Sequence, residues 1–390
     1  MNLHENEAGR AFRAEVRAWM QAHLRGEFEP LRGASGLGAP GYDAALAKRW
    51  EQQLAEGGWI GLGWPREHGG RDLPLAQQVI FHEEYVRCGG PGRLGHIGEQ
   101  LLAPTLIAHG TPEQQQRFLP GIRAGRSYWA QGYSEPGAGS DLAGVRTRAR
   151  RDAASGEWVI DGQKVWTSWA QEADWIFVLA RCADREPGAP RHHGLVLLLV
   201  PLHQPGIDVR PIRQITGSAE FNEVFLDGAR TEGALHLGAP GQGWAVAMSL
   251  LACERGVSTL GQQAHFRVEL DAVVTLARRN GAARDPLLRQ RIAQAALGLQ
   301  TLRSHALRVC VPDAPARAAS IAKYAWSNWR RALGELAMDV LGADAGIAHE
   351  DPLRQSLQQL WLASRADTIY AGTNEIQLNL IAERALGMPR

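Results

Sequence analysis

The residues best placed to bind a ligand lie in one glycine-rich stretch, YWAQGYSEPGAGSDLAGVRT at 128–147. Pro136, Gly137 and Gly139 keep side chains away from one face of this loop, so backbone N–H groups can approach a phosphate or a flavin edge. No GK[ST] follows the stretch and it does not open a helix, which excludes the Walker and Rossmann phosphate loops. From local sequence alone, a glycine-rich turn without a ligand is the alternative.

Other residues that can do chemistry also have simpler interpretations. Trp166 lies on a predicted strand, where the residue by itself favours the interpretation as a core aromatic. His192 and His193 lie in a turn rich in proline and glycine, without acidic or cysteine companions at ligand spacing. A solvated loop is therefore predicted there, and no metal site.

The elements that must position these residues begin with a helical region at 10–125. Leu46, Trp50 and Leu54 recur at helical spacing before the stop signal Gly57-Gly58. An N-terminal helical domain is predicted.

Start signals mark further helices. Thr111-Pro112-Glu113 places a cap residue, a first-turn proline and an acid in the order that a helix start prefers. After residue 241 the helical period returns, with Asp285-Pro286 opening one helix and another at about 316–341. The last part of the chain therefore resembles a helical bundle.

Between these helical parts, short β-rich runs alternate with turn signals. The runs are Glu157 to Ile160, Gln163 to Ser168, Asp174 to Arg181, Gly194 to Leu202 and Ile207 to Ile215. The first two flank Asp161-Gly162, which predicts a two-residue hairpin turn. Because no helices separate the strands, an antiparallel barrel or sandwich is expected.

The fold class predicted is α+β with several domains, since 390 residues exceed the size of one hydrophobic core. An N-terminal α-helical domain is expected at 1–127, a middle antiparallel β-barrel domain at 128–236 and a C-terminal α-helical bundle at 237–390.

Composition excludes several partners. Lys plus Arg number 42 and Asp plus Glu number 41, so no net field draws the chain to nucleic acid or an anionic membrane. No run approaches the roughly 18 apolar residues of a membrane span and the start lacks a secretory pattern, so a cytoplasmic location is expected. The four cysteines are too widely spaced for a CxxC clamp, and buried thiols are predicted; they are Cys88, Cys182, Cys253 and Cys310.

The stretch at 128–147 resembles the flavin-binding motif of the acyl-CoA dehydrogenase family. Three further blocks resemble that family in the same order: GGWIGLGWPREHGG at 57–70, DGQKVWTSWAQEADWIFVLAR at 161–181 and IYAGTNEIQLNLIAERALGMPR at 369–390. The resemblance spans nearly the whole chain. It implies the fold above, with FAD as cofactor and a role in fatty acid or lipid catabolism by β-oxidation.

The resemblance also implies which residues touch the cofactor. The residues lining the flavin and the thioester end of the substrate are Gln131, Tyr133, Ser134, Gly139 and Ser140, with Trp166 and Ser168 on the other side of the ring. The FAD pyrophosphate and adenosine are expected near Thr373, Asn374 and Glu375, where Thr373 or Asn374 can cap a helix. A cap without a ligand is the alternative.

The catalytic base is expected at Glu254. Many relatives carry it as a Glu where this chain has Ala371, which cannot titrate. A minority branch, similar to isovaleryl-CoA and long-chain acyl-CoA dehydrogenases, has Glu before Arg on an early C-terminal helix, as Glu254 and Arg255 stand in LLACERG. A surface Glu-Arg pair is the alternative. The resemblance implies that Glu254 takes the α-proton while a hydride leaves the β-carbon for flavin N5.

Further residues of the site follow from the same resemblance. The backbone N–H of Ala371 is expected to stabilise the enolate oxygen. The residues expected to touch the substrate are Ser140, Arg255, Tyr370, Ala371 and Gly372. An arginine run, Arg146, Arg148, Arg150 and Arg151, predicts a solvated strand face, with a clamp for the CoA phosphates as the alternative.

Three positions depart from the family pattern at the flavin contacts made across subunits. Asn280 stands for a Phe, Asp339 for a Gln and Ala343 for a Gly. Arg278 or Arg279 is expected to reach the pyrophosphate, whereas an Asp near phosphate repels it unless it is bridged.

The expected substrate is an acyl-CoA or an acyl-carrier thioester whose acyl group the sequence leaves open. Electrons are expected to pass to an electron-transfer flavoprotein, from a homo- or hetero-oligomer built as a dimer of dimers, a tetramer. Two alternatives stand beside this function. One is a non-catalytic or flavin-sharing structural subunit of a heterotetramer, and the other is an oxidase that uses oxygen.

Overall fold

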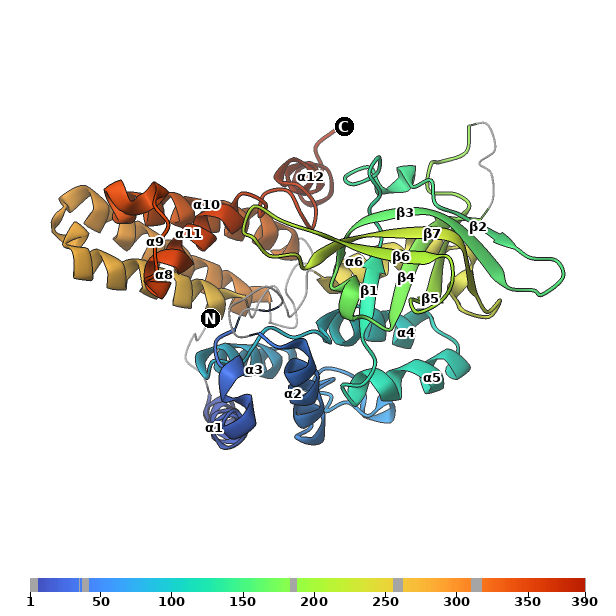
Figure 1. Cartoon of the computed structure of the whole chain (residues 1–390), viewed down its shortest axis with the longest axis horizontal. Coiled ribbons are helices and arrows are strands. Elements are labelled where there is room, and N and C mark those ends of the chain that lie inside the picture. The colour runs from blue at the N-terminus through green and yellow to red at the C-terminus, as the bar shows by residue number, and fades with distance from the viewer. Residues whose placement is uncertain are drawn as a thin grey trace. The chain divides into compact units, whose positions relative to one another are not determined.

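The computed structural model describes residues 6–34, 36, 42–182, 188–254, 262–309 and 318–389. They form two compact units (Figure 1). The first unit contains the described residues of Met1–Ala18, Leu75–Cys88 and Arg255–Arg390; the second contains those of Trp19–Pro74 and Gly89–Glu254. This division follows contacts between elements, and the domain boundaries expected after residues 127 and 236 stay a prediction.

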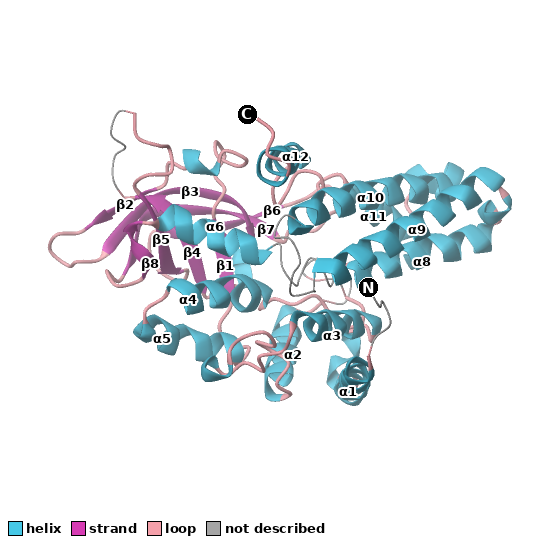
Figure 2. Ribbon diagram, turned by 180° about the vertical axis from the view of Figure 1, so that it is seen from behind, coloured by secondary structure: helices cyan, strands magenta, loops and turns pink. Residues whose placement is uncertain are grey.

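The first unit is helical. Its helices are α1 (Glu7–His23, which continues into the second unit), α3 (Leu75–Arg87), α8 (Gln263–Asn280), α9 (Pro286–Val309), α10 (Ala318–Leu341), α11 (Pro352–Ser364) and α12 (Asn374–Leu380). Helices α8 to α11 lie side by side as a bundle in both views (Figures 1 and 2). Buried Leu270 of α8, Leu299 of α9 and Leu336 of α10 are part of its apolar core.

Ion pairs join α1 and α3 to this bundle. The Glu83 carboxylate on α3 accepts hydrogen bonds from Arg13 at 2.7 Å and Arg303 at 3.2 Å, so segments far apart in the sequence meet on one side chain. The neighbouring Glu84 is fully buried and pairs with Arg13 at 2.9 Å. The described helical region before residue 127 is therefore shared between the two units.

The predicted helix boundaries are confirmed where caps define them. Helix α2 (Ala44–Glu56) ends at Gly57. Thr111 forms a capping box with Gln114 at the start of α5 (Pro112–Arg123). The Asp285 carboxylate accepts from the Leu287 N–H at 2.7 Å and opens α9.

The second unit is built around one sheet. Its strands are β1 (Trp129–Gly132), β2 (Arg148–Arg151), β3 (Trp158–Ser168), β4 (Trp175–Arg181), β5 (Leu195–Pro201), β6 (Ile207–Ile212), β7 (Phe221–Thr231) and β8 (His236–Gly241). The order is β6-β7-β3-β2-β4-β5-β8, with β1 pairing to β4. Most pairs are antiparallel, but β4 pairs in parallel with both β1 and β2. The predicted middle β domain is confirmed, although its sheet is open and not a closed barrel.

The hairpin predicted at Asp161-Gly162 is wrong. Strand β3 runs straight through these residues and pairs with β7, with a register shift between Ile160 and Gly162. A Cβ at Gly162 would lie 2.8 Å from the Cα of Thr147. The glycine therefore permits close approach of a neighbouring backbone at a bulge, the other role of glycine in a strand.

Helices cover one face of this sheet (Figure 2). They are α4 (Ala103–His109), α5 and α6 (Gly243–Glu254), and a π-helical turn at Ile97–Leu102 precedes α4. Leu106, Phe118 and Val246 from these helices pack with Phe177 and Leu197 of the sheet in one apolar core. Within the described ranges, no helix has the length and apolar character needed to cross a membrane.

Candidate active site

The glycine-rich loop after β1 leaves one side open. Glu135 and Ala138 exchange two backbone hydrogen bonds of 3.0 Å, which closes a tight turn over Pro136 and Gly137. A Cβ added at Gly137 or Gly139 would meet no protein atom within 4 Å. Neither packing nor positive φ demands these glycines, so their missing side chains leave the backbone accessible to a ligand, as the sequence predicts.

A buried ion pair fixes this loop. The Lys164 ammonium on β3 is fully buried and donates to Glu135 at 2.8 Å and to the Tyr133 and Leu179 carbonyls at 3.1 and 2.7 Å. Glu135 also accepts from the N–H groups of Arg146 and Thr147. Burial raises the pKa of Glu135, but Lys164 and these donors outweigh it, so that pKa lies below its usual value.

The end of β3 lies directly against the loop. The Val165 N–H donates to the Ser134 carbonyl at 2.9 Å, so the two predicted flavin segments are hydrogen-bonded to each other. Trp166 has φ of +61° and its side chain is 58% exposed, at a register shift between Lys164 and Thr167. The core interpretation of Trp166 is therefore wrong. An exposed indole held in a strained backbone is typical of a ligand contact.

The loop and this strand end thus gather most of the predicted flavin residues in one unit. Gln131 lies on β1 opposite Phe177, and Tyr133 is buried with its ring centroid 5.8 Å from that of Phe177, in an edge-to-face arrangement. Gly139 and Ser140 are exposed, while Ser134 and Ser168 are partly buried. This arrangement fits a flat ring with a polar edge.

A second set of predicted residues lies in the first unit, in the turn before α12. Ala371 has φ of +52° and Gly372 has φ of +87°. The Thr373 side chain accepts a hydrogen bond from the Ile376 N–H at 3.3 Å. Thr373, and not Asn374, is therefore the cap of α12. Asn374 instead bonds Ser327 and Asn328 of α10 at 2.9 and 3.2 Å.

The helix N-terminus at this turn favours an anion. Glu375 is exposed in the first turn, and bonds to its own N–H and to Thr373 lower its pKa. Acidic groups and phosphates are both stabilised at this end of a helix.

Glu254 is the last residue of α6, a helix that is otherwise uncharged. Its side chain, and Arg255 altogether, lie outside the described residues. Helix α6 packs on β5, β8 and the π-helical turn, so the backbone at its end is placed within the second unit. The role of Glu254 stays a prediction.

The departures from the family pattern have local explanations. Asp339 is bridged by Arg291 at 2.5 Å. Asn280 donates to the Val340 carbonyl at 2.7 Å and accepts from the Ala282 N–H at 3.0 Å, so it fixes the end of α8. Arg279 pairs with Asp351 at 3.0 Å, whereas Arg278 is exposed.

An arginine pocket of about 440 Å³ lies beside the loop. Its lining residues are Ala143, Gly144, Val145, Arg146, Arg148, Arg181 and Arg191. Arg191 pairs with Asp141 at 2.6 Å and Arg181 donates to backbone carbonyls, which holds both in place. Within the described chain, the guanidinium groups of Arg146 and Arg148 have no such partner, so their charge is available to an anion.

The remaining candidate residues from the sequence have structural explanations. His192 stacks on Trp244 with ring centroids 5.8 Å apart. Over the described ranges, no three His, Cys, Asp or Glu side chains gather as a metal site would require. Arg150 and Arg151 are exposed on β2, as predicted for a solvated strand face.

Sequence reasoning missed the residues that hold the site: Lys164, Glu135, Arg330, Asp367, Arg181 and Arg191. Lys164, Glu135 and Arg181 carried a signal, as charged residues inside predicted ligand motifs. The others are recognisable only from their partners, which lie far away in the sequence.

Comparison with known proteins gives a consistent result across the chain. Models of the acyl-CoA dehydrogenase N-terminal, middle and C-terminal domains match residues 6–126, 130–229 and 241–386. The chain is 55% identical over 384 residues to the acyl-CoA dehydrogenase IpdE1 of Mycobacterium tuberculosis, covering 97% of each chain.

Solved structures agree. The structure titled Tcur3481-Tcur3483 steroid ACAD is 30% identical, with a TM-score of 0.86 and 100% of both chains covered. The ChsE4-ChsE5 complex from Mycobacterium tuberculosis is 28% identical, with a TM-score of 0.85 and the same coverage.

Proposed function

The chain belongs to the acyl-CoA dehydrogenase family and is an FAD-dependent oxidoreductase, and from this we propose that it converts an acyl-CoA into the trans-2-enoyl-CoA. The observation that carries this proposal is the coupling of the open glycine-rich loop to the strand end that presents Trp166. The two segments offer backbone donors, hydroxyl groups and a flat apolar face in one place.

The residues of this chain hold the cofactor and exclude water. Gln131 of β1 and Tyr133, Ser134, Gly139 and Ser140 of the loop would hold the flavin ring, together with Trp166 and Ser168 of β3. Thr373, Asn374, Glu375 and Arg278 hold the pyrophosphate and adenosine. Bound FAD supplies the acceptor for the hydride that leaves the β-carbon.

Glu254 removes the α-proton. Ala371 itself has no titratable group, and α6 ends in the one carboxylate of an otherwise uncharged helix. The role requires a carboxylate whose pKa is raised toward neutrality by desolvation, which would suit it to remove the acidic α-hydrogen of a thioester. The Ala371 N–H donates to the thioester oxygen as negative charge develops. Arg255, Tyr370, Gly372 and Ser140 complete the substrate contacts.

The thioester carrier is CoA. Four arginines line one pocket beside the loop. Two of them, Arg146 and Arg148, form no ion pair within the described chain, so their positive charge suits the phosphates of a nucleotide. A carrier protein would present a single phosphate at its surface, whereas CoA presents several phosphates on a group small enough to enter a pocket.

The acyl group is proposed to derive from a steroid in lipid catabolism. The support comes from the relative titled a steroid ACAD, at 30% identity over the whole chain. Electrons pass to an electron-transfer flavoprotein; oxygen is the alternative acceptor.

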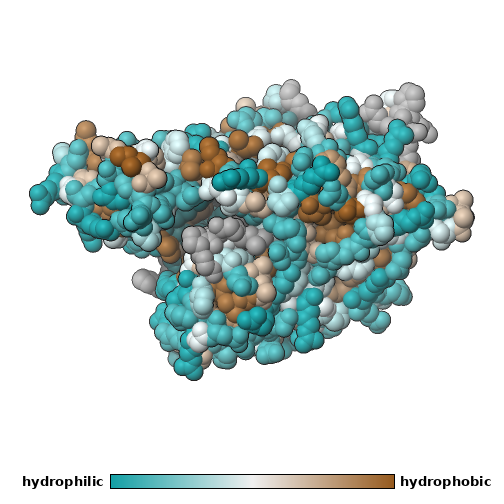
Figure 3. Space-filling view, viewed as in Figure 1, coloured by the Kyte–Doolittle hydropathy of each residue, from teal (hydrophilic) through white to brown (hydrophobic). Residues whose placement is uncertain are grey.

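A hetero-oligomer is proposed in preference to a homotetramer. Two of the solved relatives are named as pairs of chains, and here Asp339 and Asn280 are occupied by bonds within the bundle. The bundle also exposes Leu287, Leu297 and Ile347, and apolar groups lie on its surface in Figure 3. A non-catalytic role in such an assembly is the second candidate.

The test is to express the chain alone and with candidate partner chains, and to add steroid and straight-chain acyl-CoAs without oxygen. Reduction of bound flavin, seen as loss of its visible absorbance, is expected with at least one steroid acyl-CoA. A flavin that no acyl-CoA bleaches, in any assembly, would contradict the proposal. Reoxidation by air compared with an electron-transfer flavoprotein separates oxidase from dehydrogenase.

A further inference from the structure

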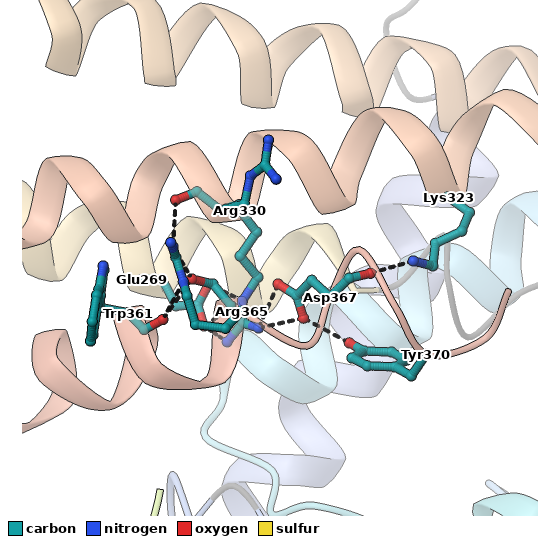
Figure 4. A network of polar contacts seen from close by, with 9 residues as sticks. Glu269, Lys323, Arg330, Trp361, Arg365, Asp367 and Tyr370 are labelled. Carbon is teal, nitrogen blue, oxygen red and sulfur yellow. Dashed lines mark hydrogen bonds and ion pairs between the residues drawn. The ribbon is translucent and has the colours of Figure 1, made fainter. Parts of the chain in front are cut away.

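A largely buried ionic network includes Asp367 and Tyr370, which lie in the turn that leads to Ala371 (Figure 4). The Asp367 carboxylate is fully buried and accepts two hydrogen bonds from Arg330, at 3.1 and 3.0 Å. Arg330 also donates hydrogen bonds of 2.7 to 3.1 Å to the Glu269 carboxylate on α8. The Tyr370 hydroxyl donates to Asp367 at 2.9 Å. All of these groups belong to the first unit.

One face of α10 holds the turn at both ends. Lys323, Ser327 and Arg330 are spaced by four and three residues, so their side chains share a face of the helix. Lys323 donates to the Asp367 carbonyl and Arg330 to the Asp367 carboxylate, at the start of the turn. Ser327 donates to Asn374 at 2.9 Å, at its end. The backbone between Asp367 and Asn374 is thereby clamped.

The charges in this network balance. Arg330 and Lys323 carry two positive charges, and Glu269 and Asp367 carry two negative charges. Burial and the Asp367 carboxylate raise the pKa of Tyr370, so its hydroxyl stays protonated and donates. The Tyr370 ring is nevertheless 42% exposed, so an anchored hydroxyl fixes a ring whose face is accessible.

The clamped turn has an unusual backbone. Ala371 has φ of +52°, a left-handed conformation that is sterically unfavourable for a residue with a Cβ. It is followed by Gly372 at +87°. The direction of the Ala371 N–H depends on these dihedrals, and the surroundings must hold them in place. Gln377 adds a contact of 3.5 Å to the Ala371 carbonyl.

We propose that Asp367 and Arg330 are positioning residues that set the Ala371 N–H and the Tyr370 ring against the thioester. The inference rests on the proposed function, in which that N–H stabilises the charge developing on the thioester oxygen. The described contacts of the network are with the turn and neighbouring helices of the first unit. Its effect on the reaction is therefore indirect, through the geometry of one hydrogen-bond donor.

Stability alone is a weak reason for such a network. A buried ion pair often contributes no more than well-packed apolar side chains would, because desolvation offsets the attraction. A donor aimed at a developing oxyanion is sensitive to small displacements, and misplacement by about 1 Å can cost about 100-fold in rate. We therefore expect the network to matter most for the rate of the reaction, which depends on one geometry of the turn.

The test uses the full-length FAD-loaded protein in its native assembly, with rapid anaerobic mixing with a reactive acyl-CoA. Asp367→Asn should lower the rate constant for flavin reduction at saturating acyl-CoA about 10- to 100-fold, with the dissociation constant changed less than about threefold. Tyr370→Phe, which loses only one hydrogen bond to the network, should lower the same rate constant by a smaller factor.

Two variants serve as controls. Glu335→Gln removes a carboxylate that pairs with Arg365 in the same bundle but does not touch Asp367, and should leave the rate unchanged. Glu269→Gln leaves the bonds between Arg330 and Asp367 intact and should cost less than Asp367→Asn. Chemical reduction of the flavin by dithionite should be the same in every variant.

The outcomes separate this inference from the proposed function. If wild-type flavin is reduced and Asp367→Asn and Tyr370→Phe react at the wild-type rate, the positioning role is refuted. Should Asp367→Asn fail to fold, Tyr370→Phe decides alone. If no acyl-CoA reduces the wild-type flavin, the function itself is wrong and this inference falls with it.

Discussion

Two regions of this protein each use an ion pair to hold a backbone segment in place, but the ion pairs differ. In the second unit, Glu135 and Lys164 hold the glycine-rich loop, next to Trp166 in a left-handed backbone. In the first unit, Asp367 and Arg330 hold the turn before α12, next to Ala371 in a similar backbone. Each region thus joins a buried carboxylate to a residue whose dihedrals its surroundings must fix.

The difference is in how the charge is shared. Lys164 is fully buried and, among the described residues, pairs with the one carboxylate of Glu135, so removing either charge leaves the other buried without an opposite charge. Arg330 is 17% exposed and binds two carboxylates, so losing one leaves the other in place. We infer that the loop anchor is all-or-none, whereas the turn anchor tolerates partial loss and changes geometry before it changes stability.

The largest effect is expected from Lys164→Met. It leaves the Glu135 carboxylate buried and unpaired, which should lower the free energy of unfolding by about 3–5 kcal/mol and release FAD. Urea unfolding and the flavin absorbance of the purified protein measure both. The double variant Lys164→Met with Glu135→Gln should recover part of the loss, because no charge is then stranded. If the urea midpoint of Lys164→Met equals that of the wild type, the loop anchor is not all-or-none.

Asp367→Asn should cost less stability, about 1–3 kcal/mol, because Arg330 keeps Glu269. The same unfolding experiment gives the comparison directly. A loss equal to that of Lys164→Met would show that the two anchors do not differ in the way described.

The pH dependence of stability should distinguish the anchors as well. Burial lowers the pKa of Lys164 to about 8 in the folded protein, against about 10.4 in an unfolded chain. Between these values the unfolded chain binds more protons, so the contribution of Lys164 to the free energy of unfolding rises with pH, by at most about 1.4 kcal/mol per unit.

This contribution is the difference between wild type and Lys164→Met, measured from about pH 7 to about pH 10. Arg330 stays charged over this range, so Arg330→Met should show no such slope. Parallel curves for wild type and Lys164→Met would mean that Lys164 titrates normally.

The smallest effect is expected at Ala371. Ala371→Gly relieves the left-handed strain but adds freedom to the unfolded chain, so a gain of about 0.5 kcal/mol is expected. The matched variant Gly372→Ala places a Cβ at φ of +87° and should instead destabilise. Thermal unfolding of both resolves the sign, and a loss from Ala371→Gly would show that its conformation is not strained.

Much of the fold follows from local sequence. Thr111, Asp285 and Thr373 cap the helices that their positions predict, because capping depends on a few neighbouring residues. The hairpin predicted at Asp161-Gly162 was wrong because that prediction, too, used local sequence alone. Its turn chemistry is local, but the pairing of β3 with β7 and the close approach of Thr147 are not.

The strand β7 was missed although it is the main partner of β3. Its inward side chains include Asn222, a polar residue that is fully buried and donates to Thr167 and Gln171, and this breaks the apolar alternation. The flavin segments were predictable because they form contiguous motifs. The networks around Lys164 and Arg330 were not, since their partners lie up to 61 residues apart.

The central claim is that Glu254 removes the α-proton of an acyl thioester beside bound flavin. The direct measurement is anaerobic flavin reduction by an acyl-CoA that bleaches the wild type, repeated with Glu254→Gln. We predict that the variant keeps its flavin and its affinity for the acyl-CoA but loses reduction by about 100- to 10,000-fold, the usual contribution of a general base. Reduction at the wild-type rate would contradict the account.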